Sequence, residues 1–333
     1  MSGPPVEIVI PVYNGARDLA ECLDSVLAQT YTGWRATVMD NCSTDGSGAI
    51  ADDYARRDPR LGVVHWTEFV GQAENYNRAL AQVIDRAPYV KVLEADNWLT
   101  PTALADAVAL AETDPTIGLV SGYALMGREI LGHGIESRAD VLTGREVCAL
   151  TIVDDTYLFG TPTNLLFRAA ALRATDPWFQ PSLFYDDADL CLRLLRGWKL
   201  GFVHQVLAFI RVDNHGVFST FQEFDFNPAF RYFMAQDHAA AFFDAGVAAE
   251  MVRDREAEYY GRLARAALGG RKRGYWEFNR NALLKRGDRL RRGRLARAIA
   301  REAVDMALNP KSTLERLLRK VPRRRADSGS GRA

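Results

Sequence analysis

Two acidic residues, Glu94 and Asp96, lie one position apart directly after Tyr89 to Leu93, a short and mostly apolar run. Such a run is typical of a buried strand, and open α/β sheets bind their ligands beyond the carboxyl ends of their strands. Carboxylate oxygens at that edge suit a divalent cation, Mg²⁺ or Mn²⁺, that holds a diphosphate. The alternative is that Asp96 and Asn97 only form a turn, and this motif alone does not decide between the two.

A third carboxylate, Asp187, stands at the start of a helix predicted over residues 186–197. Its neighbours at i+3, i+4 and i+7 are Leu190, Cys191 and Leu194, which places Asp187 on the apolar face. A carboxylate there costs free energy unless it is paired or used, while the dipole of the first helical turn helps to keep it ionised. We therefore favour a catalytic base over the alternative, a helix N-cap, for which Asp is also a preferred residue.

Two further acids of this helix are predicted on its solvated side. Asp189 precedes Arg193 by four positions, which is the favourable order for a surface ion pair. Asp186 lies three positions before Asp189 and falls on the same side. Both acids are therefore expected to be exposed, and their substitution is expected to matter much less than that of Asp187.

Alternating strands and helices must position these residues. Apolar runs predict strands at 6–12, 35–39, 61–66 and 89–93, separated by helices that include 19–27, a segment ending near 57, and 72–85. This alternation with short links is the pattern of a parallel sheet with helices on both faces. Further elements are expected at 102–113 (helix, with Thr100 as N-cap and Pro101 as first residue), 117–123 (strand), 127–134 (hairpin), 144–153 (helix) and 163–167 (strand).

The segment beyond residue 220 is predicted to be helical, at 224–243, 250–268 and 276–308. Residues 285–325 hold 15 Lys and Arg against four acids, so the net charge of +0 combines a basic arm with an acidic body. Such an arm suggests contact with an anionic membrane surface or another polyanion. The alternative, slightly favoured, is a helix packed on the catalytic domain with a solvated basic face. We expect a catalytic domain at 1–220, a helical region at 221–322 and a disordered tail at 323–333.

The composition excludes several classes of protein. With 48% hydrophobic and 25% charged residues, the chain of 333 residues is typical of a globular protein. Four cysteines without CxxC spacing, no signal-type start and no apolar run of about 18 residues predict a cytoplasmic protein with reduced thiols. Neither GxGxxG nor GxxxxGK[ST] occurs, so acids with a metal must handle the phosphates of any bound nucleotide.

Four segments, in this order, resemble the motifs of the family-2 glycosyltransferases over roughly residues 5–220. The segments are IVIPVYNG, SVLAQTYTGWRATVMDNCSTDGS, LEADNWLTP and FYDDADLCLRL. The resemblance implies a GT-A fold, which is Rossmann-like with a mostly parallel sheet, followed here by a helical C-terminal extension. It also implies an inverting transferase that uses a nucleotide-diphosphate sugar and a divalent metal.

The resemblance also implies roles for single residues in binding the donor. The backbone of Pro11, Val12 and Tyr13 would line the pocket for the nucleotide base. Asp40 would hydrogen-bond the base, and Asp45 would lie near the nucleotide.

The metal ligands and the base follow in the same way. Asp96 would ligate the metal, Glu94 would contact the ribose or the metal, and Asp187 would be the general base. His215 stands where some members place another metal or diphosphate ligand, although an ordinary loop histidine remains an alternative. Glu94 and Asn97 depart from the family pattern, in which Asp is usual at the first position and common at the second, and this puts the strength of metal binding in question.

Other departures concern the base block and its flanks. Asp186 stands where Glu is usual, and His215 follows Arg211 by four positions where two are commoner. Arg168 and Arg193 could clamp phosphate or pair with acids, and Asp189 favours pairing for Arg193.

The sequence thus favours a metal-dependent inverting glycosyltransferase of polysaccharide biosynthesis, acting on a glycan, lipid-linked or small-molecule acceptor and not on nucleic acid. The protein is expected in the cytoplasm, and at the inner face of the membrane if the basic arm binds lipid. The sequence is compatible with a monomer and with a homo-oligomer. The rival enzyme is a sugar-nucleotide nucleotidyltransferase, whose glycine-rich basic loop is missing after the first strand. The alternative without enzymatic activity is a catalytically silent protein that only binds a nucleotide sugar.

Overall fold

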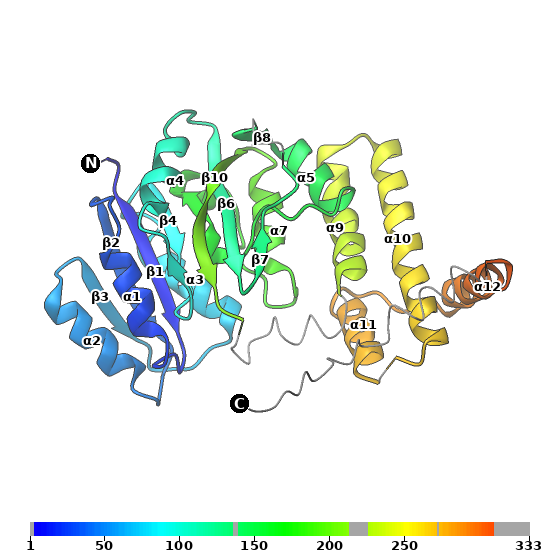
Figure 1. The fold of residues 1–333 in the computed structure, drawn as a ribbon, viewed down its shortest axis with the longest axis horizontal. Coiled ribbons are helices and arrows are strands. Elements are labelled where there is room, and N and C mark those ends of the chain that lie inside the picture. Colours follow the sequence, from blue (N-terminus) through cyan, green and yellow to red (C-terminus); the bar gives the residue numbers. More distant parts are fainter. Residues whose placement is uncertain (1–2, 136–138, 213–225, 272, 310–333) are drawn as a thin grey trace, which may run out of the picture.

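The computed structural model describes residues 3–135, 139–212, 226–271 and 273–309 (Figure 1). Within these residues ten strands form one sheet, in the order β3-β2-β1-β4-β9-β6-β10-β5, with β7 paired to β6 and β8 to β10. The strands are β1 (Val6–Val12), β2 (Trp34–Asp40), β3 (Leu61–His65), β4 (Tyr89–Val92), β5 (Trp98–Leu99), β6 (Ile117–Met126), β7 (Glu129–Leu131), β8 (Val141–Thr143), β9 (Leu166–Arg168) and β10 (Lys199–Ile210).

Helices cover both faces of the sheet and continue beyond it. They are α1 (Leu19–Leu27), α2 (Ser47–Arg57), α3 (Gln72–Val83), α4 (Ala103–Ala111), α5 (Gly144–Ile152), α6 (Ala169–Arg173), α7 (Asp186–Leu194), α9 (Asn227–Phe242), α10 (Ala245–Leu268), α11 (Arg273–Lys285) and α12 (Arg292–Leu308), with a 3₁₀ turn η1 (Pro162–Asn164). Figure 1 shows α9 to α12 gathered at one end of the molecule, beside α5 and α7.

The half of the sheet nearest the N-terminus is parallel, as its alternating pattern predicted. β1 pairs with β2 and β4, and β2 pairs with β3, all in parallel. Val12 at the end of β1 lies opposite Asp40 at the end of β2. The Leu93 amide, just after β4, donates to the Val9 carbonyl at 2.9 Å. The acids that follow β2 and β4 therefore reach the same edge of the sheet.

Side chains alternate between two hydrophobic clusters, one on each face of the sheet. In β1, Ile8 and Ile10 join the cluster under α1, α2 and α4, whereas Val9 joins the cluster that includes α3, α5, α6 and α7. All three are fully buried. Each such side chain contributes about 1.5–3 kcal/mol by leaving water, which is why a continuous apolar run predicted this strand correctly.

The second half of the sheet is mixed. β9 lies antiparallel between β4 and β6, β6 and β10 are parallel, and β5 and β8 run antiparallel to β10. The predicted hairpin near residues 127–134 is confirmed, because β7 pairs antiparallel with β6. Gly127 in its turn has φ +60, a conformation that favours glycine.

Two predicted helix boundaries were wrong. Helix α4 begins at Ala103 after Thr102, because Thr100 is held elsewhere: its Oγ1 donates to the Val206 carbonyl of β10 at 2.9 Å. The helix predicted over residues 276–308 is interrupted between α11 and α12. Gly287, with φ +73, turns the chain there, and no α-helix continues through that backbone conformation.

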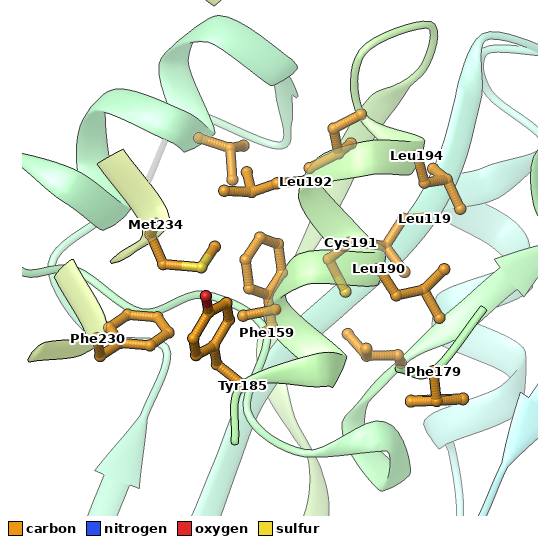
Figure 2. Close-up of a cluster of buried hydrophobic side chains, with 14 of the residues drawn as sticks. Leu119, Phe159, Phe179, Tyr185, Leu190, Cys191, Leu192, Leu194, Phe230 and Met234 are labelled. Atoms are coloured by element: carbon orange, nitrogen blue, oxygen red, sulfur yellow. The ribbon is translucent and has the colours of Figure 1, made fainter. Parts of the chain in front are cut away.

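The helical region shares a core with the sheet region (Figure 2). Phe230 and Met234 of α9 join one buried cluster with Phe159, Tyr185 and Leu192. Because this cluster includes α7, the predicted division near residue 220 does not separate two independent cores. Helix α12 packs only on the outside, against α10, and has no buried residue.

Candidate functional site

The carboxyl end of β2 presents Asp40, whose side chain is held on both oxygens. Oδ1 accepts from the Ser43 amide at 3.0 Å, and Oδ2 lies 3.0 Å from His65 Nδ1. His65 Nε2 lies 3.1 Å from Asp52 Oδ1. The hydrogen bonds to Asp40 and Asp52 raise the pKa of His65. The candidate base-binding carboxylate therefore lies beside an imidazole whose pKa it raises.

The loops that follow β1 and β2 are tied together. Asp45 Oδ2 accepts from the Ala16 amide at 2.9 Å, and its Oδ1 accepts from the Ser47 hydroxyl at 2.6 Å. Burial raises the pKa of Asp45, but these hydrogen bonds outweigh it and the net pKa is lowered. The structure thus places Asp45 as a brace between the loops, and a contact between Asp45 and a nucleotide stays a prediction.

The first loop exposes an aromatic pair. Pro11 and Val12 are buried, whereas Tyr13 is 52% exposed and its ring centroid lies 4.6 Å from that of Phe69, itself 58% exposed. Exposed rings beside a strand edge are suited to stacking on a planar base. Phe69 was not identified from the sequence, because it follows β3 in a loop without a motif.

Glu94 is fully engaged by neighbouring side chains. Its Oε1 accepts from the Tyr76 hydroxyl at 3.0 Å, and its Oε2 accepts from the Thr163 hydroxyl and the Asn97 amide, both at 3.0 Å. Burial raises the pKa of Glu94, and the charge of Asp96 raises it further. Glu94 therefore shapes the site, and Tyr76 and Thr163 are supporting residues that sequence reasoning missed.

The turn predicted at Asp96 and Asn97 is present, so the turn reading and the site reading are compatible. The Asn97 amide N–H donates to the Glu94 carbonyl at 3.0 Å, and the Asn97 side-chain oxygen accepts from the Arg211 amide at 2.9 Å. Arg211 Nε also donates to the Asp96 carbonyl at 3.1 Å. Asn97, a departure from the family pattern, thus fixes the backbone that carries Asp96.

Asp96 is half-buried at this edge and carries a carboxylate of the kind that could hold a divalent cation. No three His, Cys, Asp or Glu side chains gather as a metal site in the part of the chain that the structure describes. Mg²⁺ and similar cations are often held by one or two carboxylates, with substrate phosphates and water as the other ligands. A single half-buried carboxylate beside Glu94 fits that arrangement. His215, the other predicted metal ligand, lies outside the described residues.

Asp187 lies in the first turn of α7 with its carboxylate held at both oxygens. Oδ1 accepts from the Ala188 amide at 2.7 Å, and Oδ2 accepts from the Tyr157 hydroxyl at 3.1 Å. Burial raises the pKa of Asp187. The N-cap residue is Tyr185, so the cap alternative was wrong. Tyr157 was missed because it stands alone in a segment without periodicity.

The two predicted control acids are not on a solvated side. Asp189 does pair with Arg193 at 2.7 Å, but it is only 4% exposed because α9 covers that face. Asp186 is half-buried, and burial together with the charge of Asp187 raises its pKa to about 7. The prediction of a surface ion pair was therefore right about the partner and wrong about the exposure.

The raised pKa of Asp186 predicts a pH-dependent stability. A carboxyl with a higher pKa in the folded than in the unfolded chain binds its proton more tightly when folded, so its ionisation lowers the free energy of unfolding progressively from about pH 4 to pH 7, and the full loss persists above pH 7. Asp186→Asn removes this effect. We expect the variant to melt above the parent at pH 8 by about 2 °C or more, and to gain less at pH 5. Thermal unfolding at the two pH values checks this, and a gain independent of pH would contradict it.

Two arginines considered as phosphate clamps are engaged elsewhere. Arg168 donates to the carbonyls of Ala111 and Ile117 at 2.6 and 2.7 Å, and its guanidinium lies over the Tyr89 ring. Arg193 binds Asp189 and carbonyls of the preceding loop. Both arginines therefore stabilise the fold through these contacts.

Comparison with known proteins shows what the chain is similar to. Residues 7–172 match the model of the family described as "Glycosyl transferase family 2". The chain is 30% identical to the putative glycosyltransferase EpsE of Bacillus subtilis over 212 residues, which are 60% of this chain and 71% of EpsE. Two other curated relatives are matched over only 13% and 49% of their own length.

Two solved structures share the fold at low sequence identity. Residues 1–349 of S. aureus TarS, solved in complex with UDP-GlcNAc, match with a TM-score of 0.61 and 17% identity, over 84% of this chain and 79% of that one. The mannosyltransferase PcManGT from Pyrobaculum calidifontis, solved with GDP-Man and Mn²⁺, matches with a TM-score of 0.51 and 20% identity, over 91% and 86%.

Proposed function

Because the chain belongs to glycosyl transferase family 2, we propose that it is an inverting glycosyltransferase with Asp187 as the general base. The observation that carries the proposal is the half-buried carboxylate of Asp187, held by Tyr157 at the start of α7. Burial raises the pKa of Asp187, which makes its carboxylate a better proton acceptor than an exposed one.

The proposed reaction is one displacement. Asp187 takes the proton of the acceptor hydroxyl, and the acceptor oxygen forms a bond to the anomeric carbon from the face opposite the diphosphate. The bond from that carbon to the diphosphate oxygen breaks, and the nucleoside diphosphate leaves with the electron pair. A divalent cation held by Asp96 would neutralise charge on that leaving group.

The donor is proposed to be a nucleotide-diphosphate sugar bound along the ends of β1, β2 and β4. Support comes from Asp40, from the exposed pair Tyr13 and Phe69, and from the ligands named for the two solved structures, UDP-GlcNAc and GDP-Man. Those structures are similar in fold alone, so we propose the class of donor and not the base or the sugar.

The acceptor is proposed to approach from the helical region. A cavity of about 330 Å³ lies between the loop that precedes α7 and helix α11. Its lining includes Phe184, Tyr185, Phe278, Asn281 and Lys285. Tyr185 of this lining precedes Asp187 by two positions in the chain, and we propose that an acceptor bound in the cavity extends its hydroxyl to the base. Aromatic rings with an amide and an ammonium suit a saccharide, free or lipid-linked.

A panel of nucleotides and sugar nucleotides, with and without Mn²⁺, tests the proposed function. The expected result is a rise in melting temperature with one nucleoside diphosphate that depends on the metal, since binding to the folded state stabilises it. Release of that nucleoside diphosphate from its sugar nucleotide in the presence of acceptor would follow. Release of pyrophosphate would indicate the nucleotidyltransferase instead, and binding without any turnover would indicate the silent protein.

The basic arm leads to a separate prediction about lipid. Helix α12 is tied to α10 by Arg265 and Glu302 at 3.3 Å, which supports packing on the protein, yet Arg292, Arg297 and Arg301 face solvent. No helix of the described residues is both long and apolar enough to cross a membrane. We expect the full chain to float with anionic vesicles at low salt, because each basic residue near such a surface contributes about 1 kcal/mol. Neutral vesicles and Arg297→Glu are the controls, and a chain that ignores anionic vesicles contradicts peripheral binding.

A further inference from the structure

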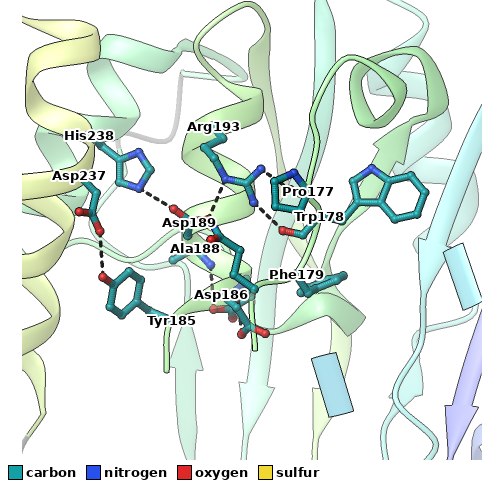
Figure 3. Close-up of polar contacts among 12 residues, drawn as sticks. Pro177, Trp178, Phe179, Tyr185, Asp186, Ala188, Asp189, Arg193, Asp237 and His238 are labelled. Atoms are coloured by element: carbon teal, nitrogen blue, oxygen red, sulfur yellow. Dashed lines mark hydrogen bonds and ion pairs between the residues drawn. The ribbon is translucent and has the colours of Figure 1, made fainter. Parts of the chain in front are cut away.

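Figure 3 shows Asp237 and His238 of helix α9 facing Tyr185 and Asp189 at the start of helix α7. Asp237 and His238, adjacent in α9, reach Tyr185 and Asp189, which lie two positions before and two positions after Asp187. Neither contact was expected from the sequence, because the residues are about 50 positions apart and carry no motif.

The first contact joins three elements. The Tyr185 hydroxyl donates to Asp237 Oδ2 at 2.9 Å. Arg286, just after α11, donates to both oxygens of Asp237 and to the Tyr185 oxygen, and its guanidinium lies 4.8 Å from the centroid of the Phe233 ring. Tyr185, the N-cap residue of α7, is thereby hydrogen-bonded to the Asp237–Arg286 ion pair of the helical region.

The second contact is a buried polar cluster around Asp189. His238 and Asp189 are 1% and 4% exposed, and His238 Nε2 lies 3.1 Å from Asp189 Oδ1, at ion-pair distance but without hydrogen-bond alignment. Asp189 Oδ2 accepts from Arg193 Nε and from Gln180, both at 2.7 Å. Burial raises the pKa of Asp189, but His238 and Arg193 outweigh it and the net pKa is lowered, so Asp189 stays ionised.

The first turn of α7 requires such support. Three carboxylates, at 186, 187 and 189, lie within it and repel one another. Tyr185 makes no side-chain capping hydrogen bond, and the Asp187 and Ala188 amides donate instead to the carboxylates of Asp186 and Asp187. The contacts from α9 and α11 hold this turn from outside the helix.

We propose that Asp237, with Arg286, and His238 are positioning residues that hold the first turn of α7 and thereby fix the direction of the Asp187 carboxylate. The proposal rests on Asp187 being the general base. It makes the helical C-terminal region a working part of the catalytic site and not an appendage, because one helix of that region holds both flanks of the base.

A matched pair of variants of the full chain tests the proposal. Tyr185→Phe removes the hydroxyl that binds Asp237, and Tyr232→Phe removes a hydroxyl that binds Glu256 at 3.1 Å within the helical region. Both tyrosines are 3% exposed, so the loss of stability should be similar. For Tyr185→Phe we expect faster hydrogen exchange over residues 186–194 and a kcat about 10-fold lower, with the donor KM unchanged, because small misplacements of a catalytic group are costly. Tyr232→Phe should change neither.

A second pair separates positioning from packing at His238. His238→Gln keeps a side-chain N–H donor toward Asp189, and His238→Leu removes it. We expect kcat to fall about 10-fold in the Leu variant and to recover largely in the Gln variant. Equal exchange over 186–194 and equal kcat in Tyr185→Phe and Tyr232→Phe would overturn the proposal. A parent chain that turns over no sugar nucleotide refutes the proposed function. In that case the hydrogen-exchange rates over residues 186–194 still test whether α9 and α11 hold the first turn of α7.

Discussion

Replacing Asp187 by Asn is expected to lower sugar transfer by about 10² to 10⁴-fold, the usual contribution of a general base. The amide keeps the shape of the side chain and an oxygen that can accept from Tyr157 or Ala188. It loses the charge and the ability to take a proton. The fold and the donor affinity should therefore survive, as checked by thermal unfolding and by nucleotide binding, while release of nucleoside diphosphate in the presence of acceptor falls.

The neighbouring Asp186→Asn is the matched control for this prediction. Both acids lie in the first turn of α7 and are half-buried, but the Tyr157 hydroxyl donates to Asp187. We expect Asp186→Asn to lose much less activity. Asp189→Asn is not a neutral control, since its carboxylate is buried between Arg193 and His238. A larger loss at 186 than at 187 would show that the wrong carboxylate was chosen as the base.

The second large effect is expected at the metal site. Asp96→Ala should abolish the binding of nucleoside diphosphate that depends on Mn²⁺, because we propose Asp96 as the protein carboxylate that holds the cation. Loss of binding at 100 times the dissociation constant removes about 2.7 kcal/mol of stabilisation, which a thermal shift resolves. The measurement is the melting temperature with nucleotide, with and without Mn²⁺.

Two other variants keep the Asp96 result interpretable. Glu94→Ala is expected to weaken binding less and through the shape of the site, because Glu94 accepts hydrogen bonds from Tyr76, Thr163 and Asn97. Glu94→Gln can keep most of these contacts and should come closer to the parent. Asp106→Ala, a half-buried acid on α4, controls for the general effect of losing a carboxylate. Equal nucleotide affinity in Asp96→Ala and the parent would refute the assignment.

The sequence by itself determined the features that depend on neighbours along the chain. Short apolar runs located β1 to β4, and apolar stripes with the helical period located helices such as α1 and α7, because the burial of each element is a local requirement. The same reasoning placed Asp187 beside Leu190, Cys191 and Leu194, all of which are buried. Acids directly after β2 and β4 had to meet at one edge, since the carboxyl ends of neighbouring parallel strands lie together.

Only the tertiary structure decided how the site is supported and which polar residues are buried. The face of α7 that appears solvated from its own sequence is covered by α9, so Asp189 is buried with His238. Tyr157 reaches Asp187 across 30 positions, and Thr163 reaches Glu94 across 69. Such hydrogen bonds join single residues from distant segments, and a single polar residue has no periodicity. Their partners are therefore determined only when the sheet and the C-terminal helices have packed together.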